Sequence, residues 1–311
     1  MAEPARVFSL GSILIDIAVE VPALPERGGD VLAGATRTLT GGGFNLAAAV
    51  ARQDVACVYA APHGTGRHGD LVRAALAAEG IAMAGPRRPG GDTGFCVIMI
   101  EPDGERTFVT VPGVEAELTR ADLDPVRPGP ADFVAVSGYD LLYPGSGPVL
   151  ADWVAGLPAH VRLALDPGPL VGDIPSERLD AVLARAAVLT LNQREARLLA
   201  GFDATGPELV AALSGRTPVD RTTLLVVREG AAGCVATGAA LGERVLAAPA
   251  PRVRAVDTTG AGDTHTGVLL AELARGSAVP PALELANRAA ALSVTRVGSA
   301  TAPHRAELVL C

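Results

Sequence analysis

Apolar residues occur along most of this chain in short runs that alternate with stretches of helical periodicity. The runs have the length of strands and lie at residues 7–10, 133–136, 161–165, 188–191 and 223–227. The stretches that carry apolar side chains on one helical face are 68–79, 148–155, 193–200 and 206–213. Strands that alternate with helices form a parallel sheet covered on both faces. The pattern therefore predicts an α/β fold with a mostly parallel central sheet.

Two segments depart from this pattern. Residues 19–40 are rich in Pro and Gly, contain short β-like runs and show no helical periodicity. Residues 93–111 predict a hairpin, with strands at 95–100 and 106–111 and a turn at 102–104. Together these segments could form a small sheet, which is either a lid over the strand ends or an ordinary surface appendage.

Polar residues follow directly after several predicted strands. Asp166, Asn192 and Arg228 each come just past one of the apolar runs, and Gly230 lies two residues further on. Open parallel sheets bind their ligands at the carboxyl ends of the strands. We therefore expect a ligand site where these residues meet.

The most informative segment is 257–265, which reads Asp-Thr-Thr-Gly-Ala-Gly-Asp-Thr-His. The small residues Gly260, Ala261 and Gly262 stand where a helix would begin, so that its free N–H groups can bind an anion. A carboxylate beside an anion site repels the ligand. Asp263 is therefore best explained as a base that takes a proton from a hydroxyl attacking a phosphoryl group. The alternative is a glycine-rich turn in which Asp263 caps the helix.

A second glycine-rich segment, Gly41-Gly42-Gly43-Phe44-Asn45, precedes an Ala-rich helical stretch at 46–51. Three glycines allow a ligand to approach the backbone closely, and the Asn45 amide can donate and accept hydrogen bonds. The segment is not a dinucleotide-binding fingerprint, because it lacks the G-x-G-x-x-G spacing. The alternative is a glycine turn with Asn45 as the N-cap.

Two more carboxylates allow two interpretations each. Asn192 and Glu195 open the helical stretch 193–200, and N-x-x-E before an apolar run is typical of a capping box. The functional alternative is that these side chains face a nucleotide and orient metal-bound water or phosphate. Asp16 lies among isoleucines, where a carboxylate is costly unless it is satisfied. A hydroxyl-bearing ligand or a buried backbone hydrogen bond could satisfy it.

Composition narrows the chemistry. All 26 basic residues are Arg, which excludes P-loop, protein-kinase and Schiff-base mechanisms that need Lys. A net charge of -8 and 3% aromatic residues argue against a nucleic-acid partner. Four cysteines without ligand-like spacing indicate a reducing compartment. We find no signal-peptide pattern and no apolar run of membrane-spanning length, and we expect a cytoplasmic protein.

The segments 41–45, 192–195 and 257–263 together resemble, in the same order, the motifs of the ribokinase-like (PfkB-type) carbohydrate kinases. The resemblance covers essentially the whole chain. It implies a three-layer α/β/α sandwich with a mostly parallel central sheet and a small β-sheet lid. The implied core comprises 1–14, 41–92 and 112–311, and the implied lid comprises 15–40 and 93–111. The implied activity is ATP-dependent phosphorylation of a hydroxymethyl group of a sugar.

The resemblance also implies a role for each site residue. Asp263 would be the catalytic base, and Gly260, Ala261 and Gly262 would form the anion hole. The sugar-binding positions would be Asp16, Gly41, Gly42, Gly43, Asn45 and Asp263. The ATP-binding positions would be Asn192, Glu195, Arg228, Gly230, Gly233, Gly262 and Asn287, with Mg²⁺ bound to Glu195 through water. Asp257, Thr259, Val294 and Gly298 match a site for a monovalent cation such as K⁺. The hairpin around Arg106 would be the lid and the surface of a homodimer.

The chain departs from ribokinases proper at two places. Gly43 and Phe44 replace the Lys that follows the paired glycines, and Ser137-Gly138-Tyr139-Asp140 stands where a sugar-contacting acid is expected. Phe44 and Tyr139 could instead form an apolar wall for a nucleoside base or a different sugar. The alternatives to a sugar kinase are therefore a nucleoside kinase of the same fold and a catalytically silent nucleotide-binding regulator. A dinucleotide-dependent oxidoreductase has the least support.

Overall fold

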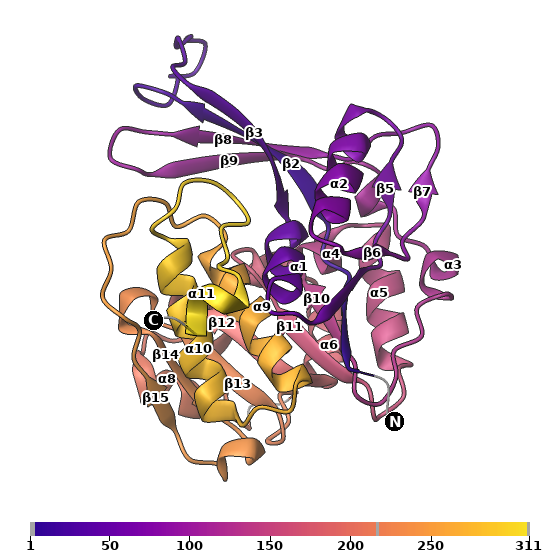
Figure 1. Ribbon diagram of the computed structural model, residues 1–311, viewed down its shortest axis with the longest axis vertical. Helices are drawn as coiled ribbons and strands as arrows, with labels where there is room; N and C mark the ends of the chain where they lie inside the picture. Colours follow the sequence, from indigo (N-terminus) through magenta and orange to yellow (C-terminus); the bar gives the residue numbers. More distant parts are fainter. Residues whose placement is uncertain (1–3, 216–217, 310–311) are drawn as a thin grey trace.

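The computed structural model describes residues 4–215 and 218–309, and at the centre of this part of the chain lies a nine-stranded sheet (Figure 1). Its strand order is β15-β14-β13-β12-β11-β10-β1-β4-β6. In chain order these strands are Arg6–Ser9 (β1), Ala56–Tyr59 (β4), Ala82–Met83 (β6), Phe133–Ser137 (β10), Arg162–Asp166 (β11), Ala186–Asn192 (β12), Leu224–Arg228 (β13), Cys234–Thr237 (β14) and Leu246–Ala248 (β15). All pairs from β6 to β13 are parallel, whereas β14 and β15 pair antiparallel at one edge. The prediction of a mostly parallel sheet is confirmed.

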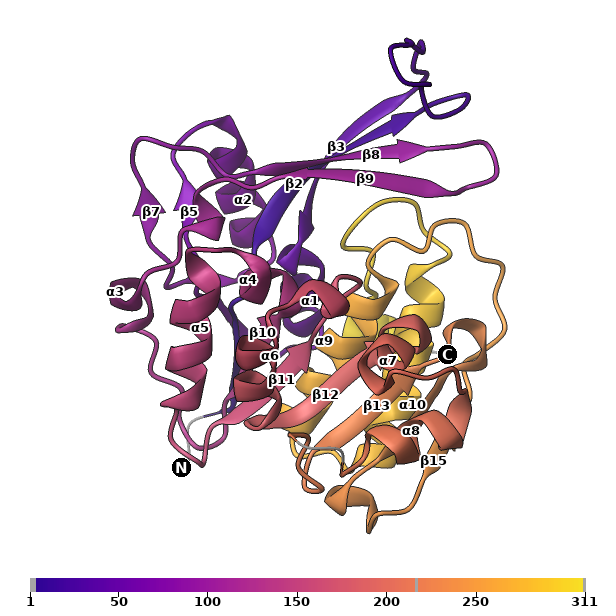
Figure 2. The same cartoon turned by 180° about the vertical axis from the view of Figure 1, so that it is seen from behind.

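Helices cover both faces of this sheet (Figures 1 and 2). One face packs against Gly43–Ala51 (α1), Arg67–Ala78 (α2), Ala261–Ala274 (α9), Val279–Ser293 (α10) and Arg305–Val309 (α11). The other packs against Gly138–Leu142 (α4), Ser146–Ala155 (α5), Ser176–Leu183 (α6), Gln193–Ala200 (α7) and Gly206–Leu213 (α8). A one-turn helix, Arg120–Leu123 (α3), lies beside α5. The three layers are those of the expected α/β/α sandwich.

The alternation of side chains along the central strands builds two separate apolar cores. In β10, Phe133 and Ala135 belong to the core under α1, α9 and α10, whereas Val134 and Val136 belong to the core under α5 and α6. Successive side chains of a strand point to opposite faces of the sheet, so a strand covered on both sides must be apolar throughout. This requirement explains why the central strands appear in the sequence as continuous apolar runs.

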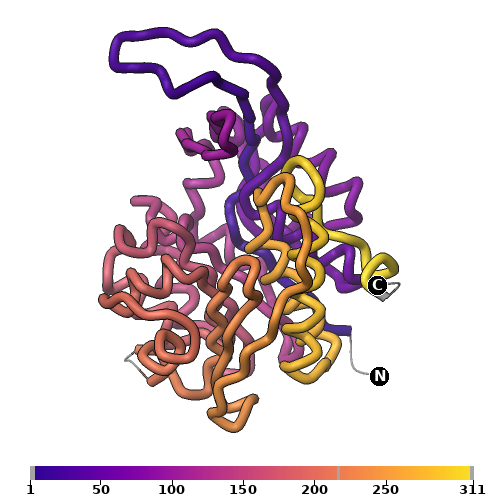
Figure 3. Tube along the Cα trace, turned by 90° about the vertical axis from the view of Figure 1, so that its left-hand side faces the viewer, coloured from indigo at the N-terminus to yellow at the C-terminus, as the bar shows by residue number. Residues whose placement is uncertain are grey.

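A second sheet projects from one edge of the molecule (Figure 3). Its strands are Ile13–Glu20 (β2), Thr36–Gly42 (β3), Phe95–Ile100 (β8) and Arg106–Val111 (β9), in the order β3-β2-β8-β9. The predicted hairpin is confirmed as β8 and β9, with Phe95 opposite Val111. A separate two-stranded pair joins His63–Gly64 (β5) to Arg87–Arg88 (β7). The division of the chain into core and lid segments stays a prediction.

The predicted helices and the predicted strands agree with the structure about equally well, and the hairpin strands β8 and β9 have their expected bounds. Helices α7 and α8 have the expected bounds, whereas α1 begins at Gly43, three residues before the predicted 46–51. Strands β14 and β15 were not predicted, because they are short and their alanines carry little strand signal. Within the described residues, no helix combines the length and the apolarity that crossing a membrane requires.

Candidate active site

The carboxyl ends of three parallel strands place their last residues close together. Asp166, Asn192 and Arg228 end β11, β12 and β13. Arg228 Nη1 lies 2.7 Å from Asp166 Oδ2, and Arg228 Nη2 lies 3.6 Å from Glu195 Oε2. The same Nη1 donates to the Gly262 carbonyl at 3.2 Å, which connects these strands to the start of α9. The structure therefore brings together the residues that follow the predicted strands.

The N-terminus of α9 presents free backbone N–H groups. Gly260 is the N-cap with φ 70°, a left-handed conformation that glycine adopts readily. The N–H groups of Gly260, Gly262 and Asp263 donate to no acceptor in the described part of the chain, and the Ala261 N–H makes only a long bond of 3.3 Å to Thr258 O. Unpaired amides at a helix N-terminus attract an anion. The N–H groups of Gly260, Gly262 and Asp263 are therefore free to bind an anion, whereas that of Ala261 is partly engaged.

Asp263 is held beside these amides by a residue from the other end of the chain. Asn45 Nδ2 donates to Asp263 Oδ2 at 3.1 Å. Burial raises the pKa of Asp263 to about 7, and the nearby negative charge of Asp166 adds to this effect, while Asn45 and Arg228 oppose it. A carboxylate with a pKa near 7 is well matched to accept a proton at neutral pH. No side-chain cap is present at the start of α9, so the alternative that Asp263 caps its helix is wrong.

The oxygen and the nitrogen of the Asn45 side-chain amide both form hydrogen bonds within the protein. Its Oδ1 accepts a hydrogen bond of 2.7 Å from the Ala300 N–H, and its side chain is buried. The N-cap of α1 is Gly42, with φ 59°, and therefore the alternative that Asn45 is the N-cap is wrong. The arrangement orients the Asn45 amide toward the Asp263 carboxylate.

At the glycines before α1, other atoms of the protein lie where a Cβ would stand. A Cβ at Gly41 would lie 1.9 Å from Asp16 Oδ2, and one at Gly43 would lie 2.2 Å from the Gly11 carbonyl oxygen. Asp16 is 8% exposed, and no donor in the described part of the chain bonds its carboxylate. Burial raises its pKa to about 7. The alternative of a buried backbone hydrogen bond to Asp16 is wrong, and the carboxylate stays available to a ligand.

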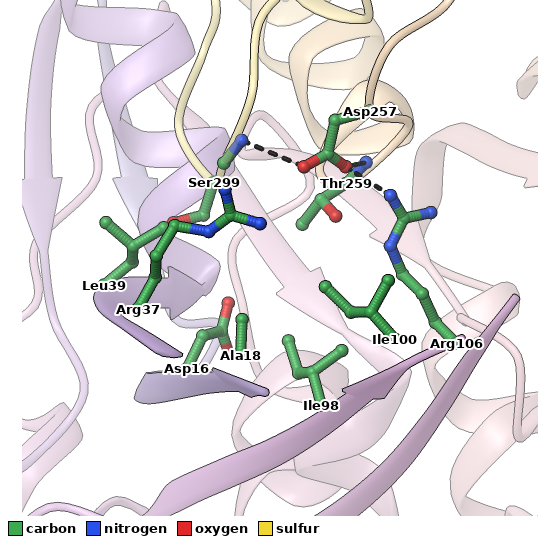
Figure 4. A pocket seen from close by; sticks show the side chains of 11 residues that line it. Asp16, Ala18, Arg37, Leu39, Ile98, Ile100, Arg106, Asp257, Thr259 and Ser299 are labelled. Atoms are coloured by element: carbon green, nitrogen blue, oxygen red, sulfur yellow. Dashed lines mark hydrogen bonds and ion pairs between the residues drawn. The ribbon is translucent and has the colours of Figure 1, made fainter. Parts of the chain in front are cut away.

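Asp16 opens into a recess between the projecting sheet and two loops of the core (Figure 4). The recess measures about 310 Å³, including space open to solvent. Its lining comes from β2 and β3 (Asp16, Ala18, Arg37, Leu39), from β8 and β9 (Ile98, Ile100, Arg106) and from the core loops (Asp257, Thr259, Gly298, Ser299). The projecting sheet therefore forms one wall of this recess.

Asn192 and Glu195 form the capping box that their spacing predicts. The Asn192 N–H donates to Glu195 Oε2 at 2.7 Å, and the Glu195 N–H donates to Asn192 Oδ1 at 2.9 Å. Asn192 Nδ2 also donates to Glu195 Oε1 at 2.6 Å. Glu195 is buried, and both of its carboxylate oxygens already accept hydrogen bonds. The capping interpretation is confirmed.

The predicted nucleotide loop is shaped by contacts with β15. Gly230 opens a short 3-10 turn with φ 60°, and Gly233 has φ 103°. A Cβ at Gly233 would lie 2.2 Å from the Ala248 carbonyl oxygen, which requires glycine at this position. Asn287 is 3% exposed, and its Nδ2 donates to the same carbonyl at 2.8 Å. The structure does not bring the Asn287 side chain to the surface of the site.

The four residues predicted for a monovalent cation lie together, but hydrogen bonds occupy their key atoms. Asp257 Oδ1 accepts from the Thr259 N–H at 2.9 Å and from Arg106 Nη2 at 2.7 Å, and Oδ2 accepts from the Gly298 N–H at 2.9 Å. The Val294 carbonyl accepts two backbone N–H groups. Partial burial raises the pKa of Asp257, but its hydrogen bonds and the Arg106 charge together lower it below the usual value.

Three features of the site were missed or misjudged from the sequence. Phe44 is 6% exposed and packs in the core, so the expectation that it forms an apolar wall is wrong, whereas Tyr139 is 39% exposed. Asp140 accepts hydrogen bonds from the backbone N–H and the hydroxyl of Ser12. Asp166 forms an ion pair with Arg228 that was not predicted. The only indication in the sequence was the position of Asp166 at the end of a predicted strand.

The three-layer fold, the projecting sheet and a carboxylate beside unpaired amides are the features expected of a phosphotransferase of α/β architecture. The chain matches the model of the pfkB family carbohydrate kinase over residues 4–305 and belongs to that family. It is an ATP-dependent kinase that acts on a sugar hydroxyl group.

Curated relatives and solved structures agree with this membership. The chain is 33% identical to the uncharacterized sugar kinase YegV of Escherichia coli (strain K12), with 98% of this chain and 93% of the relative covered. It is 30% identical to the ATP-dependent ribose-1-phosphate kinase of Halopiger xanaduensis, covering 96% of this chain and 95% of the relative. The structure of Arabidopsis thaliana ribokinase complexed with ribose and ATP superposes with a TM-score of 0.81 at 26% identity, covering 100% of this chain and 98% of the other.

Proposed function

We propose that the protein transfers the γ-phosphoryl group of ATP to a hydroxymethyl group of a sugar, with Asp263 as the base. The observation that carries the proposal is the Asp263 carboxylate, with a pKa of about 7, beside the free amides of Gly260 and Gly262. A base in this position takes the proton of the attacking hydroxyl, while the amides stabilise charge on the transferring phosphoryl oxygens.

The acceptor sugar occupies the recess beneath the lid in this proposal. Asp16 is the main hydroxyl-binding group, because its buried carboxylate has no donor among the described residues and two sugar hydroxyls would satisfy it. Gly41 allows the backbone to approach this carboxylate closely, whereas Gly42 and Gly43 leave room for the carbonyl oxygens of Ser12 and Gly11. Asn45 keeps the base oriented and has one amide N–H left for the substrate.

ATP lies on the other side of the anion hole, over the carboxyl ends of β12 and β13. Arg228 is the positive charge nearest the Gly262 backbone and is suited to the nucleotide phosphates. Gly230 and Gly233 shape the loop beside it, and Asn287 supports this loop through Ala248. Contact of the adenine with the Asn287 side chain itself is not part of the proposal.

Magnesium enters this proposal bound to the nucleotide. In the described part of the chain, no group of three or more His, Cys, Asp or Glu side chains could hold a metal ion. Mg²⁺ in phosphoryl-transfer sites is bound mainly by phosphate oxygens and water. Glu195 is the residue within reach of such water molecules, although its oxygens already cap α7. The bound ion would neutralise charge on the phosphates.

A nucleoside is the second candidate acceptor. Ile98 and Ile100 of the lid line the recess, and Tyr139 is 39% exposed at the carboxyl end of β10. Apolar and aromatic side chains of this kind suit a heterocyclic base better than a bare sugar. A phosphorylated sugar is a third acceptor class, in view of the relative named a ribose-1-phosphate kinase.

One assay separates these acceptors. ADP release would be measured at saturating MgATP with a panel of free sugars, nucleosides and sugar 1-phosphates. We expect the highest kcat/KM with a free sugar, and saturation by a nucleoside at lower KM would favour the second candidate. If no member of the panel stimulates ADP release above the water reaction, the proposed function is wrong.

We also propose a homodimer that forms through the lid. Strand β9 is an edge strand of its sheet, and Phe108, Val109 and Val111 are 57%, 51% and 42% exposed. Exposed edges with apolar side chains are commonly covered by another chain. Sedimentation of the purified protein tests this, and a monomer at micromolar concentration would contradict the proposal.

Three buried free thiols, at Cys57, Cys96 and Cys234, and the use of ATP support a cytoplasmic location.

A further inference from the structure

A positively charged side chain from β9 already contacts the loops that are predicted to bind a monovalent cation. Arg106, the first residue of β9, reaches from the lid to the loop before α9. Its Nη2 lies 2.7 Å from Asp257 Oδ1, and its Nη1 lies 3.2 Å from Thr258 Oγ1 (Figure 4 shows the Arg106–Asp257 pair). The side chains of the pair are 18% and 9% exposed. A guanidinium is always charged, and its fork suits two oxygen acceptors at once.

The donor set at this place does not fit an additional cation. Both Asp257 oxygens accept hydrogen bonds, from Arg106 and Thr259 on one side and from Gly298 on the other. The Val294 carbonyl, which would be another ligand, accepts the N–H groups of Val256 and Asp257. A second cation beside Asp257 would also meet the Arg106 charge within a few ångströms, where like charges repel strongly. The expected K⁺ site and the observed ion pair therefore exclude each other.

Asp257 matters because it organises the loop that leads into the anion hole. Its carboxylate holds the N–H of Thr259, one residue before the N-cap Gly260. The same carboxylate holds Gly298, whose loop also carries Ala300, the donor to Asn45. With its charge balanced by Arg106, the Asp257 carboxylate therefore holds in place both the loop before the free amides of α9 and the loop that bonds Asn45, the residue that orients Asp263.

We propose that Arg106 takes the place of the monovalent cation in this chain and that the enzyme needs no K⁺. Arg106 is a positioning residue, since it acts through Asp257. Because it belongs to the lid, the anion hole reaches its full order only when β9 lies against the core. The inference rests on the proposed function for its rate measurement but not for its stability measurement.

The test compares Arg106→Gln, which removes the charge and keeps most of the side chain, with the conservative Arg106→Lys. Arg27→Ala is the control, because Arg27 is an exposed arginine of the β2–β3 connection with no ion pair in the described part of the chain. ADP release is measured with the best acceptor in potassium chloride and in tetramethylammonium chloride at equal ionic strength. We expect the unchanged protein, Arg27→Ala and Arg106→Lys to have the same rate in both salts.

For Arg106→Gln we expect a rate roughly 10–100-fold lower in tetramethylammonium, because a charge-assisted contact is lost. Potassium should then restore most of the rate, since the position beside Asp257 Oδ1 that the Arg106 guanidinium occupied becomes available to the ion. The melting temperature without substrate gives a second readout. Potassium should raise it by about 2–4 °C over tetramethylammonium in Arg106→Gln only, through preferential binding to the folded state.

Three results would overturn the inference. They are a rate of the unchanged protein that depends strongly on K⁺, an Arg106→Gln rate that K⁺ does not restore, and an Arg106→Gln melting temperature that is equal in both salts. If no acceptor is turned over by any variant, the proposed function fails, and the melting temperatures still decide whether Arg106 replaces the ion.

Discussion

The two ends of the short segment 257–263 use the same residue type in opposite ways. At the first end, Asp257 has both oxygens bonded by donors, and its pKa lies below the usual value. At the second end, Asp263 has one amide donor and another carboxylate nearby, and burial raises its pKa to about 7. Six positions thus separate a carboxylate whose pKa is lowered by its donors from one whose pKa is raised by burial.

The difference shows that the number of donors decides the role. Hydrogen bonds to a carboxylate favour its charged form, whereas burial without donors favours the neutral form. Asp257 is fully supplied with donors and holds a loop in place. Asp263 accepts a single hydrogen bond, from Asn45, and its remaining lone pairs have no donor in the described part of the chain.

Replacing the base should have the largest effect. Asp263→Asn keeps the size and the contact with Asn45 but cannot accept the proton, so kcat should fall by roughly 10²–10⁴-fold. Binding of ATP should stay within about 3-fold of the unchanged protein in calorimetry, since a change of that size is under 1 kcal/mol. The control is Asp152→Asn on α5, which removes an exposed carboxylate far from the site. Retention of near-normal turnover by Asp263→Asn would falsify the assignment.

The pH profile should report the raised pKa of Asp263. The base acts only when it is unprotonated, and its pKa is about 7, so kcat should be flat above neutral pH and fall about tenfold per unit below pH 7. Asp16 has a similar pKa and acts on binding, so its titration should appear in KM. Turnover at saturating acceptor, measured from pH 5 to 9, checks this. An activity limb near pH 4 would mean that the reacting carboxylate is an ordinary one.

Removing the amide that orients the base should shift this profile. Asn45→Ala takes away the hydrogen bond that opposes the effect of burial, and the midpoint of kcat should move to higher pH. The Ala300 N–H also loses its acceptor, at a cost of about 1–3 kcal/mol in the free energy of unfolding. Gln53→Ala is the matched control, since Gln53 is a buried amide just after α1 that bonds Pro303 O at 2.9 Å. It should destabilise the protein without moving the midpoint, and equal midpoints in both variants would contradict the role of Asn45.

The smallest effect is expected at the residue between the two ends. Gly260→Ala places a Cβ at φ 70°, which costs about 1–2 kcal/mol of folding free energy, and brings it within 3.0 Å of Asn45 Cγ. Gly276→Ala separates the two causes, because Gly276 has φ 86° and open space around it. Chemical denaturation should give similar losses for both variants, but only Gly260→Ala should lower kcat. Equal kcat values would show that the contact with Asn45 is unimportant.

Local pattern was sufficient for the elements and for part of the site. The central strands are apolar throughout because both faces are covered, and the bounds of α7 and α8 followed from periodicity and from the Asn192–Glu195 capping box. The start of α9 followed from its small residues. These features depend on neighbours within a few positions, which is the range that a sequence pattern records.

The partners of the site residues could not be predicted in this way. Asn45 meets Asp263 across 218 positions, and Arg106 meets Asp257 across 151. The local pattern had indicated Asn45 as an N-cap or as part of a ligand loop, and the family resemblance had implied a sugar contact for Asn45 and a cation-ligand role for Asp257. The crossing of α1 with α9 gives Asn45 its protein partner Asp263, and the approach of β9 to the core gives Asp257 its partner Arg106.

The sequence by itself determined which residue types stand at the strand ends and at the first turn of α9, and with them the class of chemistry. Only the tertiary structure decided which carboxylate is supplied with donors and which is buried with a single donor. The physical reason is that a pKa and an ion pair depend on the distance to charges and donors in space. Those distances are set by how the helices and the lid pack together.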